Sequence, residues 1–400
     1  MFRYIVQPGD TVLRIAKMFH LHADAIYTAN PHISSANHLS PGLVLSIPTP
    51  EPQQYCIQQG DTMMGIARMF GVPVNRIMAV NPYLNPQALL PGQLVTIPPG
   101  MSGRIVEANE EYGPRQLARD LGRLKSLYPF LEIGEYGSSV LGQPLVYIRL
   151  GTGTRRIHIN AAFHANEWIT SLVAMTYIED LARALSLGET YRGVEPEALL
   201  RRCQLIVAPM VNPDGVELAQ QGATPSHPYY ESLLKWNRYS PRFFRWKANI
   251  RGVDLNDQFP AHWEEECARR GTDGPGPRDY PGTAPLSEPE AAAIAELARR
   301  EQFDIILALH TQGQEIYWNY RDMEPPGSEQ LAARLGLVSG YRPVKLTGSD
   351  AGYKDWFIQE FGKPGFTIEA GYGVNPLPLS QFADIYDEMA PLLLEVMTAE

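Results

Sequence analysis

The sequence predicts an α/β protein with a mixed, mostly parallel sheet flanked by helices, preceded by two small α+β domains of β-α-α-β order. Two observations lead there. Motifs in residues 1–100 recur after 50 or 51 positions. From about residue 104, strand-like apolar runs alternate with longer helical patterns. Because 400 residues exceed what one core usually organises, we predict domains at residues 1–50, 51–101 and 102–400.

The composition is that of a packed protein, with 44% hydrophobic and 20% charged residues. No apolar run is long enough to span a membrane, so we expect no membrane partner. Residues 1–100 hold five basic and four acidic residues, and the remainder holds 29 and 40. Neither part has the basic excess of a nucleic-acid-binding protein. The near-neutral N-terminal part, residues 1–100, is better suited to binding an uncharged polymer.

Cysteine usage and the first residues bear on the compartment. Cys56, Cys203 and Cys267 lie far apart without metal-binding or disulfide spacing, so we expect three separate thiols. The chain starts without the charged and apolar pattern of a secretion signal. Both features favour a reducing compartment.

Each repeat in residues 1–100 is expected to contain a short strand, two helices and a closing strand. A threonine can cap the first helix, and an Asn-Pro pair ends the second because proline discourages its continuation. A Pro-Gly turn then leads into the closing strand. The recurring pairs are Gly9-Asp10-Thr11 and Gly60-Asp61-Thr62, Asn30-Pro31 and Asn81-Pro82, and Pro41-Gly42 and Pro91-Gly92; the helices and closing strands fall at 23–29 and 74–80, and at 44–47 and 94–97.

This pattern resembles the LysM domain. The resemblance implies binding to glycan that contains N-acetylglucosamine, which means peptidoglycan or chitin. The alternative is a pair of structural domains that bind nothing, because a fold does not establish a function. Residues 48–52 are expected to form a stiff linker, and residues 98–100 mark the end of the second repeat.

The remainder is predicted to contain a buried sheet covered by helices. The apolar runs bounded by turn residues read as strands, and the longer periodic segments read as helices. The predicted strands are 145–150, 156–162, 204–209, 305–309 and 365–368, and the predicted helices are 113–127, 169–185, 288–300 and 330–335, followed by a C-terminal helix.

Candidate catalytic residues follow three of these strands, at the edge where α/β sheets usually present ligand groups. His164 and Glu167 come just after the 156–162 strand, and His310 follows the 305–309 strand. Two histidines and one glutamate suit zinc and leave a fourth place for water. Glu369 closes the 365–368 strand and can serve as the general base, although such a carboxylate is more often an ion-pair partner.

The motifs that carry these residues resemble, in order, those of the M14 zinc carboxypeptidases. The resemblance implies a zinc carboxypeptidase-like fold with one Zn²⁺ bound by His164, Glu167 and His310, and Glu369 as base. Asn256 would contact a substrate carboxylate. Lys247 stands where the family usually has the arginine that polarises the scissile carbonyl, and nearby Arg251 is the alternative. The motifs are His164-x-x-Glu167, Val211-Asn-Pro-Asp-Gly215, Gly252-Val-Asp-Leu-Asn256, Leu309-His310 and Thr367-Ile-Glu369.

Three positions depart from the carboxypeptidase pattern. Asp257 replaces the arginine that clamps a C-terminal carboxylate, so its charge should repel a C-terminus, and Thr347 stands where the family has a mobile tyrosine. Lys354 falls where these enzymes set the preference for the residue beyond the cut bond, and its charge suits a residue with an extra carboxylate, such as meso-diaminopimelate. The sequence is therefore similar to the bacterial γ-D-glutamyl-L-diamino acid endopeptidases, which join two LysM repeats to this peptidase domain.

We thus expect a zinc-dependent peptidase that cuts the γ-D-glutamyl–L-diamino acid bond of peptidoglycan stem peptides. The alternatives are a broad-specificity zinc carboxypeptidase and a catalytically inactive cell-wall-binding protein. A wall substrate and a missing signal are reconciled by a cytoplasmic, spore-associated or wall-associated bacterial protein, acting in muropeptide recycling or in sporulation. Diaminopimelate and lysine remain open as the diamino acid.

Overall fold

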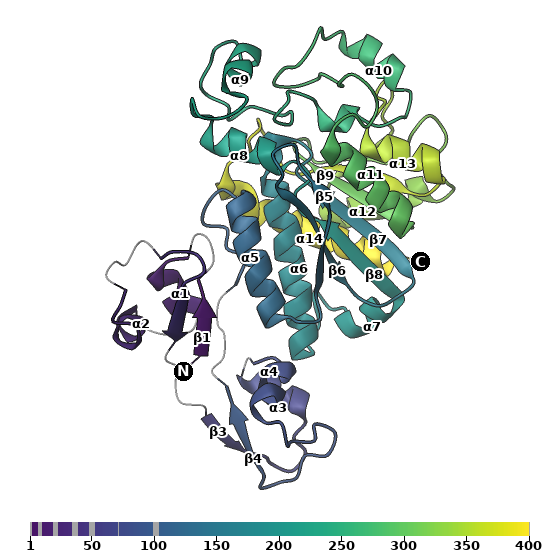
Figure 1. Ribbon diagram of the computed structural model, residues 1–400. Coiled ribbons are helices and arrows are strands. Elements are labelled where there is room, and N and C mark those ends of the chain that lie inside the picture. Colours follow the sequence, from purple (N-terminus) through teal and green to yellow (C-terminus); the bar gives the residue numbers. More distant parts are fainter. Residues whose placement is uncertain are drawn as a thin grey trace. The chain divides into compact units, whose positions relative to one another are not determined.

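The computed structural model describes residues 2–6, 10–18, 23–33, 39–47, 53–70, 72–98 and 104–399. The chain divides into two compact units (Figure 1). One comprises Met1–Glu107, Arg115–Phe130 and Ile178–Ala198, and the other comprises Ala108–Pro114, Leu131–Tyr177 and Leu199–Glu400. The predicted linker at 48–52, residues 99–100 and both predicted domain boundaries lie outside the described residues, so the boundaries stay predictions.

Both N-terminal repeats have the predicted β-α-α-β order. Within each repeat the two strands pair antiparallel, and the helices close a separate small apolar core, around Ile15 and Leu45 in the first and Ile66 and Val95 in the second. The elements are β1 (Phe2–Ile5), α1 (Val12–Met18), α2 (Ala23–Ala29) and β2 (Val44–Ile47), then β3 (Gln53–Cys56), α3 (Met63–Phe70), α4 (Val74–Val80) and β4 (Leu94–Ile97).

The repeated motifs act through their side chains. Thr62 Oγ1 accepts a hydrogen bond from the Gly65 amide at 3.0 Å, which confirms the predicted cap of α3. Asn81 Nδ2 donates to the carbonyls of Ile77 and Thr96, both at 2.7 Å, and its Oδ1 accepts from the Thr96 amide at 2.9 Å. The asparagine therefore fastens the second helix to the closing strand. The same contacts recur in the first repeat from Thr11 and Asn30.

The large sheet has eight strands in the order β11-β10-β12-β9-β7-β8-β6-β5. Its centre, β12-β9-β7-β8, is parallel, and the outer pairs β5-β6, β6-β8 and β10-β12 are antiparallel. The mixed, mostly parallel sheet is thus confirmed. The strands are β5 (Glu132–Ser138), β6 (Pro144–Leu150), β7 (Arg155–Ala161), β8 (Cys203–Ala208), β9 (Ile305–His310), β10 (Glu315–Tyr317), β11 (Arg342–Val344) and β12 (Gly365–Glu369).

Helices lie on both sides of this sheet (Figure 1). On one side α11 and α13 pack on a cluster that includes Ile206, Ile306 and Trp356. Both faces are apolar, because every residue of β9 is buried. The helices not yet named are α5 (Pro114–Leu127), α6 (Ile169–Leu187), α7 (Pro196–Arg202), α8 (Pro213–Gln221), α9 (Tyr230–Trp236), α10 (Trp263–Arg270), α11 (Pro289–Glu301), α12 (Ser328–Ser339), α13 (Tyr353–Phe361) and α14 (Phe382–Thr398).

One buried asparagine organises the loops at the carboxyl edge of the sheet. Asn212 caps α8 by accepting a hydrogen bond from the Gly215 amide at 3.1 Å. Its Nδ2 donates to the carbonyls of Phe163 and Ala248, both at 3.1 Å. Three segments that are distant in sequence are thereby held together beside His164. In the described part of the chain, no helix is long and apolar enough to cross a membrane.

Candidate active site

The predicted metal ligands come from adjacent parallel strands. β7 ends at Ala161, and the chain turns through Ala162, whose φ is 50°, before reaching His164 and the short 3₁₀ helix Ala165–Glu167. His310 is the last residue of β9, which pairs with β7 in parallel. Since parallel strands end at the same edge of a sheet, the register brings the three side chains together.

The geometry of these side chains fits one metal ion. His164 Nδ1 lies 2.9 Å from Glu167 Oε1, and His310 Nδ1 lies 3.0 Å from His164 Nδ1 and 3.1 Å from Glu167 Oε2. All three residues are buried. A tetrahedral zinc ion with bonds near 2.0–2.1 Å separates its ligand atoms by about 3.3 Å, which is close to these distances. Two ring nitrogens and a carboxylate oxygen that lie this close together are favourably placed to bind a cation between them.

Ionisation of Glu167 also suits a metal ligand. Burial raises the pKa of its carboxyl, but the charges and hydrogen bonds of His164 and His310 outweigh burial and lower it to about 2. Glu167 is therefore an anion throughout the neutral range, as metal coordination requires.

Further residues hold the ligands in place. Asp254 is fully buried, and its Oδ1 lies 3.3 Å from His164 Nε2. The Thr311 amide donates to Glu167 Oε2 at 3.2 Å, and Asn375 Nδ2 donates to Glu167 Oε1 at 3.1 Å. Such outer contacts orient ligands and tune metal affinity. Asn375 lies in the loop after β12 and carries no motif from which the sequence could have identified it.

Glu369 lies beside the predicted metal ligands, at the same edge of the sheet. It is the last residue of β12 and is in register with His310 on β9. It lines a cavity of about 340 Å³ together with His164, Glu167 and Lys247. Burial and the charge of Glu167 raise the pKa of Glu369 to about 8, against the opposing charges of His310 and Lys247. A carboxyl that titrates near neutral pH can both accept and return a proton.

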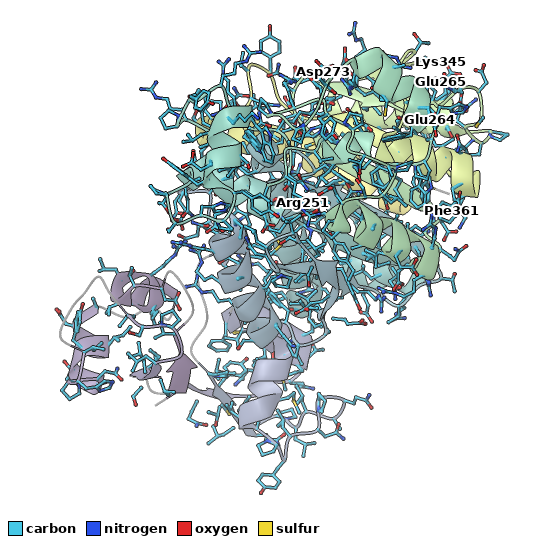
Figure 2. The ribbon with its side chains drawn as sticks, turned by 45° about the horizontal axis from the view of Figure 1, so that its top comes forward. Arg251, Glu264, Glu265, Asp273, Lys345 and Phe361 are labelled. Carbon is cyan, nitrogen blue, oxygen red and sulfur yellow. The ribbon has the colours of Figure 1, made fainter. Side chains whose placement is uncertain are left out.

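Of the two candidates for polarising a carbonyl, only Lys247 lines this cavity. Its Nζ lies 2.9 Å from Asp254 Oδ2. Arg251, which is labelled in Figure 2, instead lies 3.6 Å from Glu288, measured from Nη1 to Oε2. Two cations that sequence reasoning missed, Arg245 and Arg278, also line the cavity.

Asp257, whose charge we expected to repel a substrate C-terminus, is buried and paired with another residue of the protein. It is 2% exposed, and Arg270 Nη2 lies 2.8 Å from its Oδ1. Burial and the charge of Asp254 raise the pKa of Asp257 to about 7, although Lys247 and Arg270 act in the opposite direction. Asn256 Oδ1 accepts a hydrogen bond from the Tyr353 amide at 3.2 Å.

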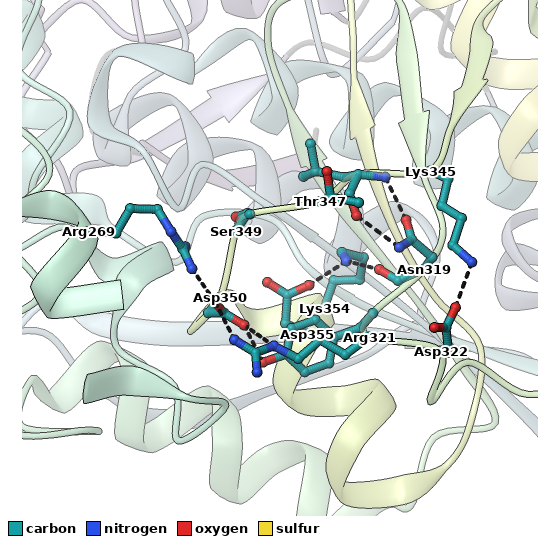
Figure 3. A pocket seen from close by; sticks show the side chains of 13 residues that line it. Arg269, Asn319, Arg321, Asp322, Lys345, Thr347, Ser349, Asp350, Lys354 and Asp355 are labelled. Carbon is teal, nitrogen blue, oxygen red and sulfur yellow. Dashed lines mark hydrogen bonds and ion pairs between the residues drawn. The ribbon is translucent and has the colours of Figure 1, made fainter. Parts of the chain in front are cut away.

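Thr347 and Lys354 line a second cavity, of about 360 Å³ (Figure 3). Lys354 is buried, forms an ion pair with Asp355 and donates to the Asn319 carbonyl at 2.6 Å. Its charge is therefore already paired. The other cations that line this cavity are Arg269, Arg321 and Lys345, and Arg269 and Arg321 both contact Asp350. Lys345 pairs with Asp322, and Arg321 also pairs with Glu265.

Three side chains that converge as potential metal ligands, with a carboxylate beside them, make this a candidate catalytic metal centre of the hydrolytic type. The family follows from comparison with known proteins. Residues 117–382 match the zinc carboxypeptidase model, and residues 4–48 and 55–98 each match the LysM domain. The chain belongs to the M14 zinc carboxypeptidase family, carries two LysM domains, and is a metallopeptidase whose family uses zinc.

Two relatives cover much of the chain. It is 43% identical over 388 residues to γ-D-glutamyl-L-diamino acid endopeptidase 1 of Lysinibacillus sphaericus, across 84% of this chain and 98% of that protein. It is 39% identical over 297 residues to the uncharacterized protein YqgT of Bacillus subtilis, across 73% of this chain and 79% of that one.

Solved structures support the fold. Bovine thrombin-activatable fibrinolysis inhibitor, in complex with tick carboxypeptidase inhibitor, superposes with a TM-score of 0.57 at 20% identity, covering 73% of this chain and 97% of that one. Carboxypeptidase A of Helicoverpa armigera superposes with a TM-score of 0.53 at 16% identity, covering 81% and 79%. At these identities the likeness concerns the fold alone.

Proposed function

We propose that the protein hydrolyses the γ-D-glutamyl–L-diamino acid bond of bacterial stem peptides, with one Zn²⁺ per catalytic domain. The main support for this proposal is that all three predicted metal ligands are present and converge, whereas the arginine that clamps a carboxylate in the family is missing. His164, Glu167 and His310 converge, whereas the clamp position holds Asp257, which is buried and paired with Arg270. A free C-terminal carboxylate finds no arginine at position 257, which argues against ordinary carboxypeptidase action. The name of the Lysinibacillus relative supports the same bond.

His164, Glu167 and His310 would hold the zinc ion, which supplies Lewis-acid polarisation and makes a water more acidic. Glu369 would take a proton from the attacking water and return it to the leaving amine. Lys247, held by Asp254, would donate to the oxygen of the scissile carbonyl as charge develops there. Lysine offers a single point charge, whereas the guanidinium of arginine can donate two parallel hydrogen bonds. The ion pair with Asp254 therefore has the larger part in orienting Lys247 toward the carbonyl.

The second cavity would receive the diamino acid. Meso-diaminopimelate ends in both an ammonium and a carboxylate, and this cavity presents both signs of charge. Lys345 and Arg321 line it alongside Asp322 and Asp350 (Figure 3). Because Lys354 is paired with Asp355, we assign recognition of the extra carboxylate to the whole cavity, Thr347 included, and no longer to Lys354 alone.

The LysM domains would hold the enzyme on peptidoglycan glycan and place it at the cell wall or on released wall fragments. Their sequence is close to neutral, which suits an uncharged sugar polymer. Binding of particular muropeptides is part of the same proposal.

The test uses the tripeptide L-Ala-γ-D-Glu-meso-diaminopimelate. We expect zinc-loaded protein to release free diaminopimelate and L-Ala-D-Glu, and a chelator to abolish release until zinc is restored. Trimming of ordinary peptides from the C-terminus, with the γ-bond left intact, would instead support the broad carboxypeptidase. Failure on both substrates by zinc-loaded protein would support a wall-binding protein without activity.

A further inference from the structure

Three cations line the cavity that His164, Glu167 and Glu369 also line. Arg245 and Lys247 come from one segment that precedes the Gly252–Asn256 motif, and Arg278 comes from the loop after α10. The Ala165 amide donates to the Lys247 carbonyl at 3.0 Å, and Asn166 Nδ2 lies 3.5 Å from the Arg245 carbonyl. The segment that bears Arg245 is therefore attached to the turn that bears His164 and Glu167.

The three cations differ in their partners. Lys247 Nζ lies 2.9 Å from Asp254, and Arg278 Nε lies 3.2 Å from Asp279. Arg245 is exposed, and its guanidinium lies 5.6 Å from the centre of the Phe244 ring. Within the described residues, no carboxylate lies at ion-pair distance from Arg245. Its charge is thus available to an anion that enters the cavity.

The two cavities have no lining residue in common. If the diamino acid occupies the cavity of Thr347 and Lys354, the acyl side of the cut bond lies in the cavity of Arg245. The expected anion on that side follows from chemistry. A γ-linked glutamyl residue is joined through its side-chain carbonyl, so its α-carboxylate stays free. Four single bonds separate the two carboxyl carbons, which places the α-carboxylate about 5 Å from the scissile carbonyl.

We propose that Arg245 binds the α-carboxylate of the D-glutamyl residue, with Arg278 as a weaker second contact, and so favours a glutamyl residue whose α-carboxylate is free. This deepens the proposed function and rests on it. Arginine can hold a carboxylate through two parallel hydrogen bonds, which neither Lys247 nor a backbone amide can offer. An α-linked glutamyl peptide also has a carboxylate four bonds from its scissile carbonyl, but its acylated nitrogen is on the carbon next to that carbonyl, whereas in the γ-linked residue it is on the carbon next to the carboxylate.

The test compares two substrates and four enzymes. The substrates are L-Ala-γ-D-Glu-meso-diaminopimelate and its D-isoglutamine counterpart, in which an amide replaces the α-carboxylate. We expect the unaltered enzyme to favour the carboxylate substrate by about 10- to 100-fold in kcat/KM, mainly through KM. Arg245→Gln should abolish this preference and leave cleavage of the amide nearly unchanged. Arg245→Lys should restore part of it, and Arg278→Gln should reduce it less.

Arg242→Gln is the matched control, because Arg242 is an exposed arginine of the same segment that does not line the cavity. It should keep the preference intact. The role of Arg245 is overturned if Arg245→Gln loses kcat/KM equally on both substrates. It is also overturned if the unaltered enzyme cuts both substrates equally well. In either case the proposed function stands. If the unaltered enzyme cuts neither γ-bond, the proposed function fails and this role fails with it.

Discussion

Glu369 has two properties expected of a catalytic base: it lines a cavity together with His164 and Glu167, two of the three predicted metal ligands, and its pKa is raised to about 8 by burial and by Glu167. Substitution by glutamine keeps its size and removes proton transfer. We expect Glu369→Gln to bind zinc normally and to lower kcat by roughly 10²- to 10⁴-fold. Zinc content and kcat would be measured on the same sample.

Glu315→Gln is the control for Glu369→Gln. Glu315 pairs with Glu369 across β10 and β12 but does not line the cavity. It should retain activity. Full activity of Glu369→Gln would exclude Glu369 as the base.

Asn375 is a positioning residue, because its Nδ2 donates to Glu167 Oε1 and to the Thr311 carbonyl, at 3.1 and 2.8 Å. Removing this amide should loosen the Glu167 carboxylate. We expect Asn375→Ala to weaken zinc binding by about 10- to 100-fold, measured by competition with a chelator. Val374→Ala, next in the chain and also at the cavity, should leave zinc affinity unchanged. Equal affinities in the two variants would contradict the assignment.

At the scale of the element, strand β7 contains a buried histidine that should make stability depend on pH. His158 is fully buried, its ring stacks on Phe303 at 4.3 Å, and its Nδ1 lies 3.0 Å from the Ile206 carbonyl. Burial lowers the pKa of His158 from 6.5 to about 3, although the hydrogen bond to Ile206 opposes this. The folded state therefore holds the ring neutral.

A histidine whose pKa is depressed on folding stabilises fully above its unfolded pKa and loses that contribution as pH falls toward the folded pKa. Between pH 6.5 and about 3 the loss should be about 1.4 kcal/mol per pH unit. We expect His158→Phe, which preserves stacking, to have a smaller decrease in unfolding free energy from pH 7 to pH 5 than the unaltered protein. Urea unfolding at both pH values measures this. Equal decreases would show that His158 does not control acid stability.

The sequence predicted the central elements well because their signals are local. The strands β9 and β12 are apolar runs that end at His310 and Glu369, and β7 ends at Ala161, three residues before His164; their carboxyl ends had to meet once the sheet was parallel. The sequence did not predict β5, because its residues, EIGEYGS, include two glycines and none of them is fully buried. The strands β10 and β11 are three residues long, too short for a periodic pattern.

For the site, the sequence pointed to residues that the structure brings together, whose roles as ligands and base stay predictions, but it did not show which charges are already paired. Asp257 was expected to repel a carboxylate, and Lys354 was expected to attract one. Arg270 and Asp355 pair with these residues. Asn375 and Arg245 reach the site through loops, where no periodicity or motif indicates proximity.

At the scale of the whole molecule, binding and hydrolysis are assigned to different parts of the chain. The LysM repeats each have a core of their own, and the catalytic residues all lie in the other compact unit. We expect removal of residues 1–100 to reduce co-sedimentation with cell walls by at least about tenfold, because two linked binding modules contribute avidity. Cleavage of the small tripeptide should persist, provided that the zinc content of the shortened protein is unchanged. Unaltered wall binding would contradict the role of the repeats.

The central claim is that a carboxypeptidase-like metal centre here cuts an internal γ-bond. The most direct measurement is digestion of L-Ala-γ-D-Glu-meso-diaminopimelyl-D-Ala in ¹⁸O-labelled water, with mass spectrometry of the products. The account predicts one ¹⁸O atom in the side-chain carboxylate of L-Ala-D-Glu and release of unlabelled diaminopimelyl-D-Ala. Label in the carboxylate of a tripeptide that ends in diaminopimelate, with free unlabelled D-Ala, would show C-terminal trimming and contradict it.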